Sequence, residues 1–391
     1  MVSILLLGPL FALTGCDFFV AQNNNPPAAT AGDFIYVANG GNTFIAGYTV
    51  GSNGSLSIVP NSPVNNGVAG LCLAISPANT FLFVGTTNGI YEYAINSDGS
   101  LSIGNGGSPV AQDVIATALQ VDSTGGYLLA AGLASATQAQ GIGIYQINTS
   151  NGVLSALGGS PLGLYTGPAA SPTVLTPTGL LITPDNAKVY VSLGTLGVQV
   201  LTLGPGGALS AGNGATILPP YGKSAGPSDY GLASDPNTKF LFVGEINTGL
   251  RVLSIGTNGS LTEVAGSPYT TGAGPVGVTV DSTGAYVYVA NKGSSNINAF
   301  ALNASSGQLT SISGSPFGSG GQLPTAMVND NTGKYLAVMN SGSNGLNGNN
   351  DLQLFSFSAS TPGALKAAAS ATTGTDPTSP QAIAATFPAA K

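Results

Sequence analysis

The sequence predicts an all-β fold, a seven-bladed β-propeller with four-stranded antiparallel blades, and three observations support this prediction. One pattern of four short β segments separated by turns recurs along the 391 residues, and one copy reads VDSTGAYVYVANKGSSNINAFALNASSGQLTSISGSP from Val280. The length of the repeat is typical of a propeller blade. The second and third segments, such as FLFVG and YVYVA, are apolar on both faces, which suits strands between neighbouring blades. The fourth segment alternates polar and apolar residues, as an outer strand does.

The first segment of the repeat occurs seven times. The copies are LCLAIS from Leu71, TALQVD from Thr117, TGLLIT from Thr178, YGLASD from Tyr230, VGVTVD from Val276, TAMVND from Thr325 and QAIAAT from Gln381. The seventh has no strands after it, whereas the strands that begin at Asp33 and Thr43 have no first segment before them. We therefore expect the C-terminal strand to pair with the three N-terminal strands, which closes the ring and leaves no exposed edge strand.

One column of the aligned first segments holds only small residues. Innermost strands of a radial array crowd around a narrow channel, and this crowding favours small side chains. Cys72 belongs to the column, so we interpret it as a packing residue, since the sequence has no His that could activate its thiol. The column consists of Cys72, Ala118, Gly179, Gly231, Gly277, Ala326 and Ala382.

The N-terminal region indicates export and anchoring. A short apolar run ends in the tetrapeptide LTGC at Cys16, which resembles a bacterial lipobox and implies that Cys16 carries lipid. Residues 1–16 are then a lipoprotein signal peptide, residues 17–32, with the core NNNPPAA, a flexible tether, and residues 33–388 the propeller. We expect an extracytoplasmic protein of the cell envelope, periplasmic or on the cell surface, held to the membrane by this anchor.

The blade motifs themselves carry a family resemblance. The repeated DSTGxYxYVAN, the GxL that opens the fourth segment and the closing GSP resemble the seven-bladed propellers of the lactonase family, which includes propeller-type 6-phosphogluconolactonases. The likeness extends from Asp33 to Phe387. It implies hydrolysis of sugar or cyclic-acid lactones by His, Arg and Glu side chains at the channel mouth. The chain has no His, and its one Arg, Arg251, falls inside a third segment.

The two faces of the predicted ring differ. On the turn face, which carries the turns between segments one and two and between three and four, the sequences are repetitive, and we interpret Asp122, Asp281 and Asp330 as structural turn formers. The opposite face, here the irregular face, carries longer loops, and long loops on a rigid scaffold often hold binding sites. These loops are residues 132–141, 162–177, 213–227 and 341–350.

Two departures from the repeat coincide in the copy that begins at Asp229. Asp229 replaces the usual Pro, Gly or Ala, and Glu245 stands where other copies have Asn. Tyr221, Lys223 and Tyr230 lie nearby in the sequence. These five residues are the candidate ligand-binding site, and the two carboxylates are the candidate general acid and base. The alternative is a solvated rim with incidental charges.

Composition narrows the function classes. The formal charge of -7 and the 8 Lys and Arg residues argue against nucleic acid. No glycine-rich phosphate loop opens a helix, and no cofactor is expected. Metal binding by clusters of His or Cys is excluded by the composition, although a Ca²⁺ site made of Asp and carbonyl groups stays open. The preferred function is a monomeric binding module for a small polar ligand, glycan or protein on the irregular face. The alternatives are a lactone hydrolase and a structural envelope protein.

Overall fold

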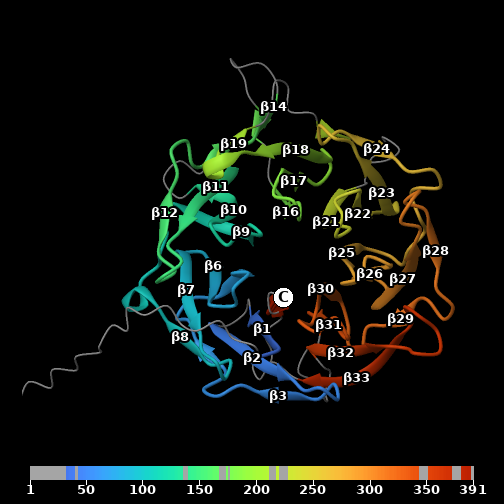
Figure 1. Cartoon of the computed structure of the whole chain (residues 1–391), viewed down its shortest axis with the longest axis horizontal. Helices are drawn as coiled ribbons and strands as arrows, with labels where there is room; N and C mark the ends of the chain where they lie inside the picture. Colours follow the sequence, from blue (N-terminus) through green and yellow to red (C-terminus); the bar gives the residue numbers. More distant parts are fainter. Residues whose placement is uncertain are drawn as a thin grey trace, which may run out of the picture.

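The computed structural model describes residues 32–39, 43–134, 140–166, 173–174, 177–210, 217–219, 228–342, 351–371 and 380–388. Seven antiparallel sheets surround a central axis (Figure 1), which confirms the predicted seven-bladed propeller. The predicted signal peptide, Cys16 and almost all of the tether lie outside the described residues.

Blades are numbered here from the N-terminus, and their strands are given from the axis outward. Blade 1 has β34 (Pro380–Ala385), β1 (Phe34–Asn39), β2 (Phe44–Val50) and β3 (Leu56–Ile58); blade 2 has β5 (Gly70–Ile75), β6 (Phe81–Thr86), β7 (Gly89–Ile95) and β8 (Leu101–Ile103); blade 3 has β9 (Val114–Val121), β10 (Tyr127–Ala134), β11 (Gln140–Ile147) and β12 (Leu154–Ala156); blade 4 has β16 (Gly179–Ile182), β17 (Lys188–Ser192), β18 (Val198–Leu203) and β19 (Leu209–Ser210).

The remaining blades follow the same order. Blade 5 has β21 (Ser228–Ser234), β22 (Phe240–Ile246), β23 (Gly249–Ile255) and β24 (Leu261–Glu263); blade 6 has β25 (Pro275–Val280), β26 (Tyr286–Asn291), β27 (Asn296–Leu302) and β28 (Leu309–Ser311); blade 7 has β30 (Pro324–Asn329), β31 (Tyr335–Asn340), β32 (Leu352–Phe357) and β33 (Leu365–Ala371). Of two short 3-10 turns, η1 (Asn105–Gly107) follows the outer strand β8, and η2 (Pro205–Gly207) precedes the outer strand β19.

The second strands form the most buried layer of the ring. All residues of β1, β6 and β31 are buried, as expected for strands that are apolar on both faces. Each blade presents these residues to its two neighbours, so the core is a series of seven interblade layers. Burial of both sheet faces is the reason for the continuous apolar runs in the sequence.

The recurring Ser-Pro motif divides the outer strand. In blades 1, 3, 4 and 6 a short extra strand also pairs with the third strand, and in blades 1, 3 and 6 it follows the Ser-Pro pair: β4 (Val64–Asn65), β13 (Leu162–Gly163), β20 (Ile217–Leu218) and β29 (Phe317–Gly318). Where the motif is Ser followed by a cis-Pro, the Ser Oγ accepts a backbone N–H of the third strand across the break. These bonds run from Gly47 to Ser62, Ile144 to Ser160, Val252 to Ser267 and Ala299 to Ser315, at 2.8 to 3.0 Å.

The innermost strands are bulged where they approach one another most closely. A register shift interrupts the pairing of the first with the second strand in blades 1, 2, 3, 5, 6 and 7. The small-residue column lies at this position. A Cβ added to Gly231 would lie 2.4 Å from the carbonyl oxygen of Val276 on the next blade, and one added to Gly277 would lie 3.0 Å from that of Thr325. Backbone crowding between neighbouring first strands therefore explains the column.

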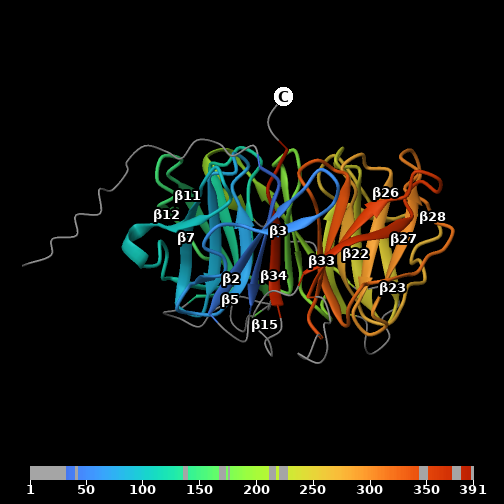
Figure 2. The same cartoon turned by 90° about the horizontal axis from the view of Figure 1, so that it is seen from below.

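Ring closure also follows the prediction. β34 pairs antiparallel with β1, with Val37 opposite Ile383, so the last strand of the chain is the innermost strand of blade 1. The backbone N–H of Phe34 donates to Thr386 Oγ1 at 2.9 Å, which joins the two chain ends. Both ends of the described ring, Gly32 and Pro388, lie on the turn face, and Figure 2 shows the segment after β34 at that face.

A pair of carboxyl groups lies beside this joint. Asp33 precedes β1, and Asp330 follows β30 of blade 7; Asn331 N–H donates to Asp33 Oδ1 at 3.2 Å. Burial raises the pKa of Asp33 to about 7, and the hydrogen bond and charge of Asp330 add to the increase. The folded protein therefore binds a proton at Asp33 more tightly than the unfolded chain does.

We expect Asp33→Asn to stabilise the protein at pH 8 but not at pH 4. Because the raised pKa favours the protonated folded state, the stability due to this group is fully present below its unfolded pKa of 3.8 and is lost as the pH rises through about 7. The amide removes the ionisation and keeps an oxygen that can accept from Asn331. Urea unfolding at both pH values measures the difference. Asp98→Asn is the control, since hydrogen bonds from Ser100 lower the pKa of Asp98. Equal stability of Asp33→Asn and wild type at pH 8 would contradict the assignment.

Candidate functional site

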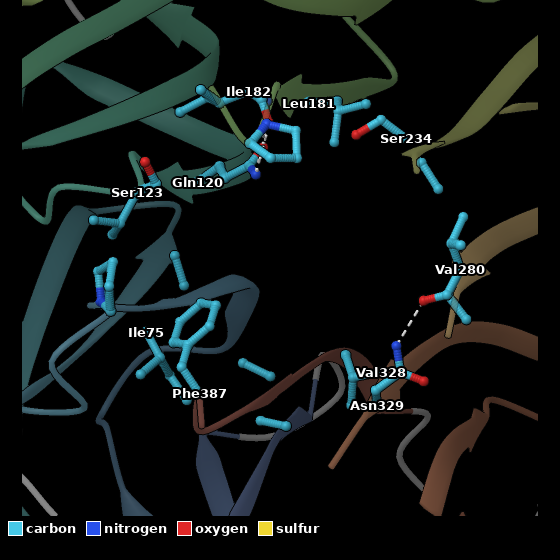
Figure 3. Close-up of a pocket in the computed structure, with 18 of the residues that line it drawn as sticks. Ile75, Gln120, Ser123, Leu181, Ile182, Ser234, Val280, Val328, Asn329 and Phe387 are labelled. Carbon is cyan, nitrogen blue, oxygen red and sulfur yellow. Dashed lines mark hydrogen bonds between the residues drawn. The ribbon is translucent and has the colours of Figure 1, made fainter. Parts of the chain in front are cut away.

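A cavity of about 930 Å³ lies on the axis at the turn-face end of the channel. Its wall consists of the last residues of the seven first strands and the turns that follow them (Figure 3). Each blade contributes, so the site is assembled from segments that extend from residue 73 to residue 388. Such a volume is within the range usual for small-molecule sites.

The wall is mainly aliphatic, with Leu181, Val280 and Val328 among its side chains. Two longer polar side chains of the wall bond sideways to backbone. Gln120 Oε1 accepts the N–H of Ile182 on the next blade at 2.7 Å, and Asn329 Nδ2 donates to the Val280 carbonyl at 2.8 Å. These amides connect neighbouring first strands, which do not form a common sheet.

The rim of the cavity is formed by the turns between first and second strands. In all seven blades the residue directly after the first strand accepts, through its side-chain oxygen, the N–H of the first residue of the second strand. The acceptor and donor residues are Ser76 and Phe81, Asp122 and Tyr127, Thr183 and Lys188, Asp235 and Phe240, Asp281 and Tyr286, Asp330 and Tyr335, and Thr386 and Phe34, at 2.7 to 3.0 Å. The aspartates are also buried, so the structural interpretation of Asp122, Asp281 and Asp330 is confirmed.

Phe387 stands at the rim with 43% of its surface exposed. Its backbone is fixed by Asn79 of the neighbouring blade: Phe387 N–H donates to Asn79 Oδ1 at 2.7 Å, and Asn79 Nδ2 donates to the Phe387 carbonyl at 2.8 Å. The ring is thus held beside the opening (Figure 3). An exposed aromatic side chain at a cavity entrance is a suitable contact for an apolar ligand.

The cavity has few groups that could catalyse a reaction. Among the described residues that line it, none is Lys, Arg or Glu, and its acidic side chain, Asp330, accepts hydrogen bonds from Thr332 and Tyr335. General acid or base catalysis needs a titratable group within reach of the substrate. The arrangement can therefore bind a molecule, and its one candidate for acid–base chemistry among the described lining is Asp330, which is hydrogen-bonded within its turn and paired with Asp33.

The candidate carboxylates from the sequence lie elsewhere. Asp229 is paired with Glu245 in the register of β21 and β22, as their coincidence in the sequence suggested. Asp229 lies three residues from Leu232, the nearest cavity residue of its strand, or about 10 Å along β21. Glu245 is completely buried, whereas an exposed rim was expected. Tyr221 and Lys223, and the side chains of Asp229 and Tyr230, lie outside the described residues.

Arg251 is committed to a structural contact. Its Nε donates to Glu263 Oε2 at 2.8 Å, its Nη1 donates to the Pro219 carbonyl at 2.7 Å, and its surface is 5% exposed. Cys72 is likewise buried, its thiol donates to the Ala116 carbonyl, and burial raises its pKa to about 12. Neither residue faces the cavity.

Most of the four long loops of the irregular face fall outside the described residues, so a site there stays a prediction. One of them, expected as a loop over residues 162–177, contains β13 and a hairpin of β14 (Tyr165–Thr166) and β15 (Thr173–Val174). In the described ranges there is no group of three or more His, Cys, Asp or Glu residues that could hold a metal ion. Those ranges also contain no helix long and apolar enough to cross a membrane.

Fold and repeat together define the class of protein, a seven-bladed β-propeller, and comparison with known families names the family. The model of the family described as lactonase, 7-bladed beta-propeller, matches residues 61–378. The chain therefore belongs to the seven-bladed β-propeller lactonase family.

Solved structures give the same fold. A protein of Bacteroides uniformis provisionally assigned as a 6-phosphogluconolactonase has 17% sequence identity and a TM-score of 0.67, with 91% of this chain and 100% of that chain covered. A similarly assigned protein of Bacteroides fragilis has 16% identity, a TM-score of 0.67 and coverages of 92% and 99%. The periplasmic gluconolactonase PpgL of Pseudomonas aeruginosa has 17% identity, a TM-score of 0.67 and coverages of 91% and 99%. No curated protein matched.

Proposed function

We propose that the protein is a binding module of the cell envelope, anchored by lipid at Cys16, and that it acts by binding a ligand rather than by hydrolysing one. The observation that carries the proposal is the composition of the cavity, which is formed by all seven blades and has no Lys, Arg or Glu among its described lining. The sequence has no His, and Arg251 is held by Glu263. A member of a lactonase family without these groups is better suited to recognition than to hydrolysis.

Lactone hydrolysis is the second candidate function. It is supported by the family match and by the direct pairing of Asp229 with Glu245 across β21 and β22. In this alternative one carboxylate would activate water, and the other would protonate the leaving oxygen. The solved relatives named as gluconolactonases suggest sugar lactones as substrates to test.

We expect wild-type protein to hydrolyse gluconolactone and 6-phosphogluconolactone no faster than buffer does, because the described cavity wall has no Lys, Arg or Glu and its one carboxyl group, that of Asp330, is held by hydrogen bonds. Hydrolysis is measured by proton release for the wild type, Asp229→Asn and Glu245→Gln, with Asp98→Asn as a control. A clear wild-type rate that falls about a hundredfold or more in either amide variant, but not in the control, would establish the hydrolase instead.

We expect Cys16→Ser to move the protein from the membrane fraction to the soluble fraction, since the serine cannot carry the thioether-linked lipid. Several acyl chains hold a protein firmly, whereas one binds only marginally. Fractionation and intact mass measurement report the change. Cys72→Ala is the matched control, because it removes the other thiol, which is buried in the ring. An unchanged distribution and an unchanged mass for Cys16→Ser would refute the anchor.

A further inference from the structure

The channel mouth has the properties of a site for an apolar molecule. At about 930 Å³ it has room for about 30 water molecules at ~30 Å³ each. Its aliphatic wall offers these waters few partners: Gln120 Oε1 and Asn329 Nδ2 are bonded to backbone on neighbouring blades, which leaves Asn329 Oδ1 as a buried polar atom without a partner. Displacement of poorly bonded water by an apolar ligand is favourable.

Charge limits the identity of the ligand. No cationic side chain lines the described wall, and four of the seven rim turns carry a buried carboxylate: Asp122, Asp235, Asp281 and Asp330. An anion would be repelled by these groups, in a chain whose formal charge is -7. A cation would lose hydration against the aliphatic wall without an unengaged carboxylate there to replace it. The ligand that fits best is uncharged.

The position of the mouth indicates where such a ligand comes from. The chain enters the ring at residue 32 and leaves it at residue 388, and Thr386 Oγ1 donates to the carbonyl of Gly32 at 3.1 Å beside the cavity. If Cys16 is lipidated as proposed above, the chain joins the ring on the turn face, 16 residues after the anchor in the sequence. The cavity then opens on the face at which the lipid-anchored end of the chain enters the ring.

We propose that the channel mouth binds a neutral single-chain amphiphile, such as a long-chain alcohol or a monoacylglycerol. The alkyl chain lies along the axis, between wall residues such as Leu181 and Val328, and it points towards the small-residue column. The uncharged head remains at the turn face, and Phe387 covers one side of the chain. This inference rests on the proposed binding function and names the class of ligand.

The test is calorimetric titration of the purified full chain with 1-decanol, decanoate and decyltrimethylammonium. We expect decanol to bind at least about tenfold more tightly than either ion, since burial of an unpaired charge in the apolar mouth is unfavourable. Phe387→Ala should weaken decanol binding about three- to tenfold, and Ser234→Phe, which fills part of the cavity, should abolish it. Ile58→Ala is the control, because Ile58 is 66% exposed on an outer strand. The melting temperature of each variant establishes that it is folded.

Three results would overturn the proposal. These are no decanol binding by the wild type, decanoate binding as tight as that of decanol, or decanol binding that survives in both folded mouth variants. The last result would place the amphiphile elsewhere on the protein. None of these three results involves hydrolysis of a lactone, whereas the proposed binding function fails if the wild type hydrolyses lactones. Failure of this inference is therefore distinguishable from failure of the proposed binding function.

Discussion

The close approach of seven first strands around one axis is the constraint on which the rest of the structure depends. At Gly231 and Gly277 the backbone of the next blade occupies the space in which a larger side chain would lie. The bulges in six first strands lie at the same level, where an extra residue bends the strand locally. Below the turns, therefore, the strands converge on small residues, and nearer the turn face they line a cavity.

Closure of the ring determines which residues form the mouth. Because β34 is the innermost strand of blade 1, residues after it complete the rim of the cavity. Thr386 takes the same role in its turn as Asp281 and Asp330 take in theirs, although its hydrogen-bond partner, Phe34, is more than 350 residues away along the chain. The bonds of Asn79 to Phe387 then connect the C-terminal segment to blade 2. The joint that closes the fold and the entrance to the candidate site are thus one structure.

The architecture could be predicted because every repeat contains the local sequence pattern of a blade. Apolar runs, turn residues such as Asp122 and the small-residue column each follow from a single physical requirement that recurs seven times. The cavity could not be predicted in this way, because its volume depends on what seven distant segments leave empty around the axis. Its signal in the sequence is the set of aliphatic residues just before the turns, which a sequence pattern does not distinguish from strand core. Glu245 illustrates the same limit, since its place in the repeat is visible but its complete burial is not. The partner of Arg251, Glu263, also depends on the outer strand pairing.

Denaturant unfolding of Gly231→Ala beside Gly158→Ala tests this constraint most directly. Both changes add one methyl group, but the new Cβ at Gly231 would meet the Val276 backbone, whereas that at Gly158 would have no heavy atom within 4 Å. Crowding at the axis predicts that Gly231→Ala lowers the free energy of unfolding by about 1–3 kcal/mol, as overpacking does, while Gly158→Ala leaves it within about 0.5 kcal/mol. Equal stabilities of the two variants would contradict the claim that backbone contact between first strands selects the small residues of the ring.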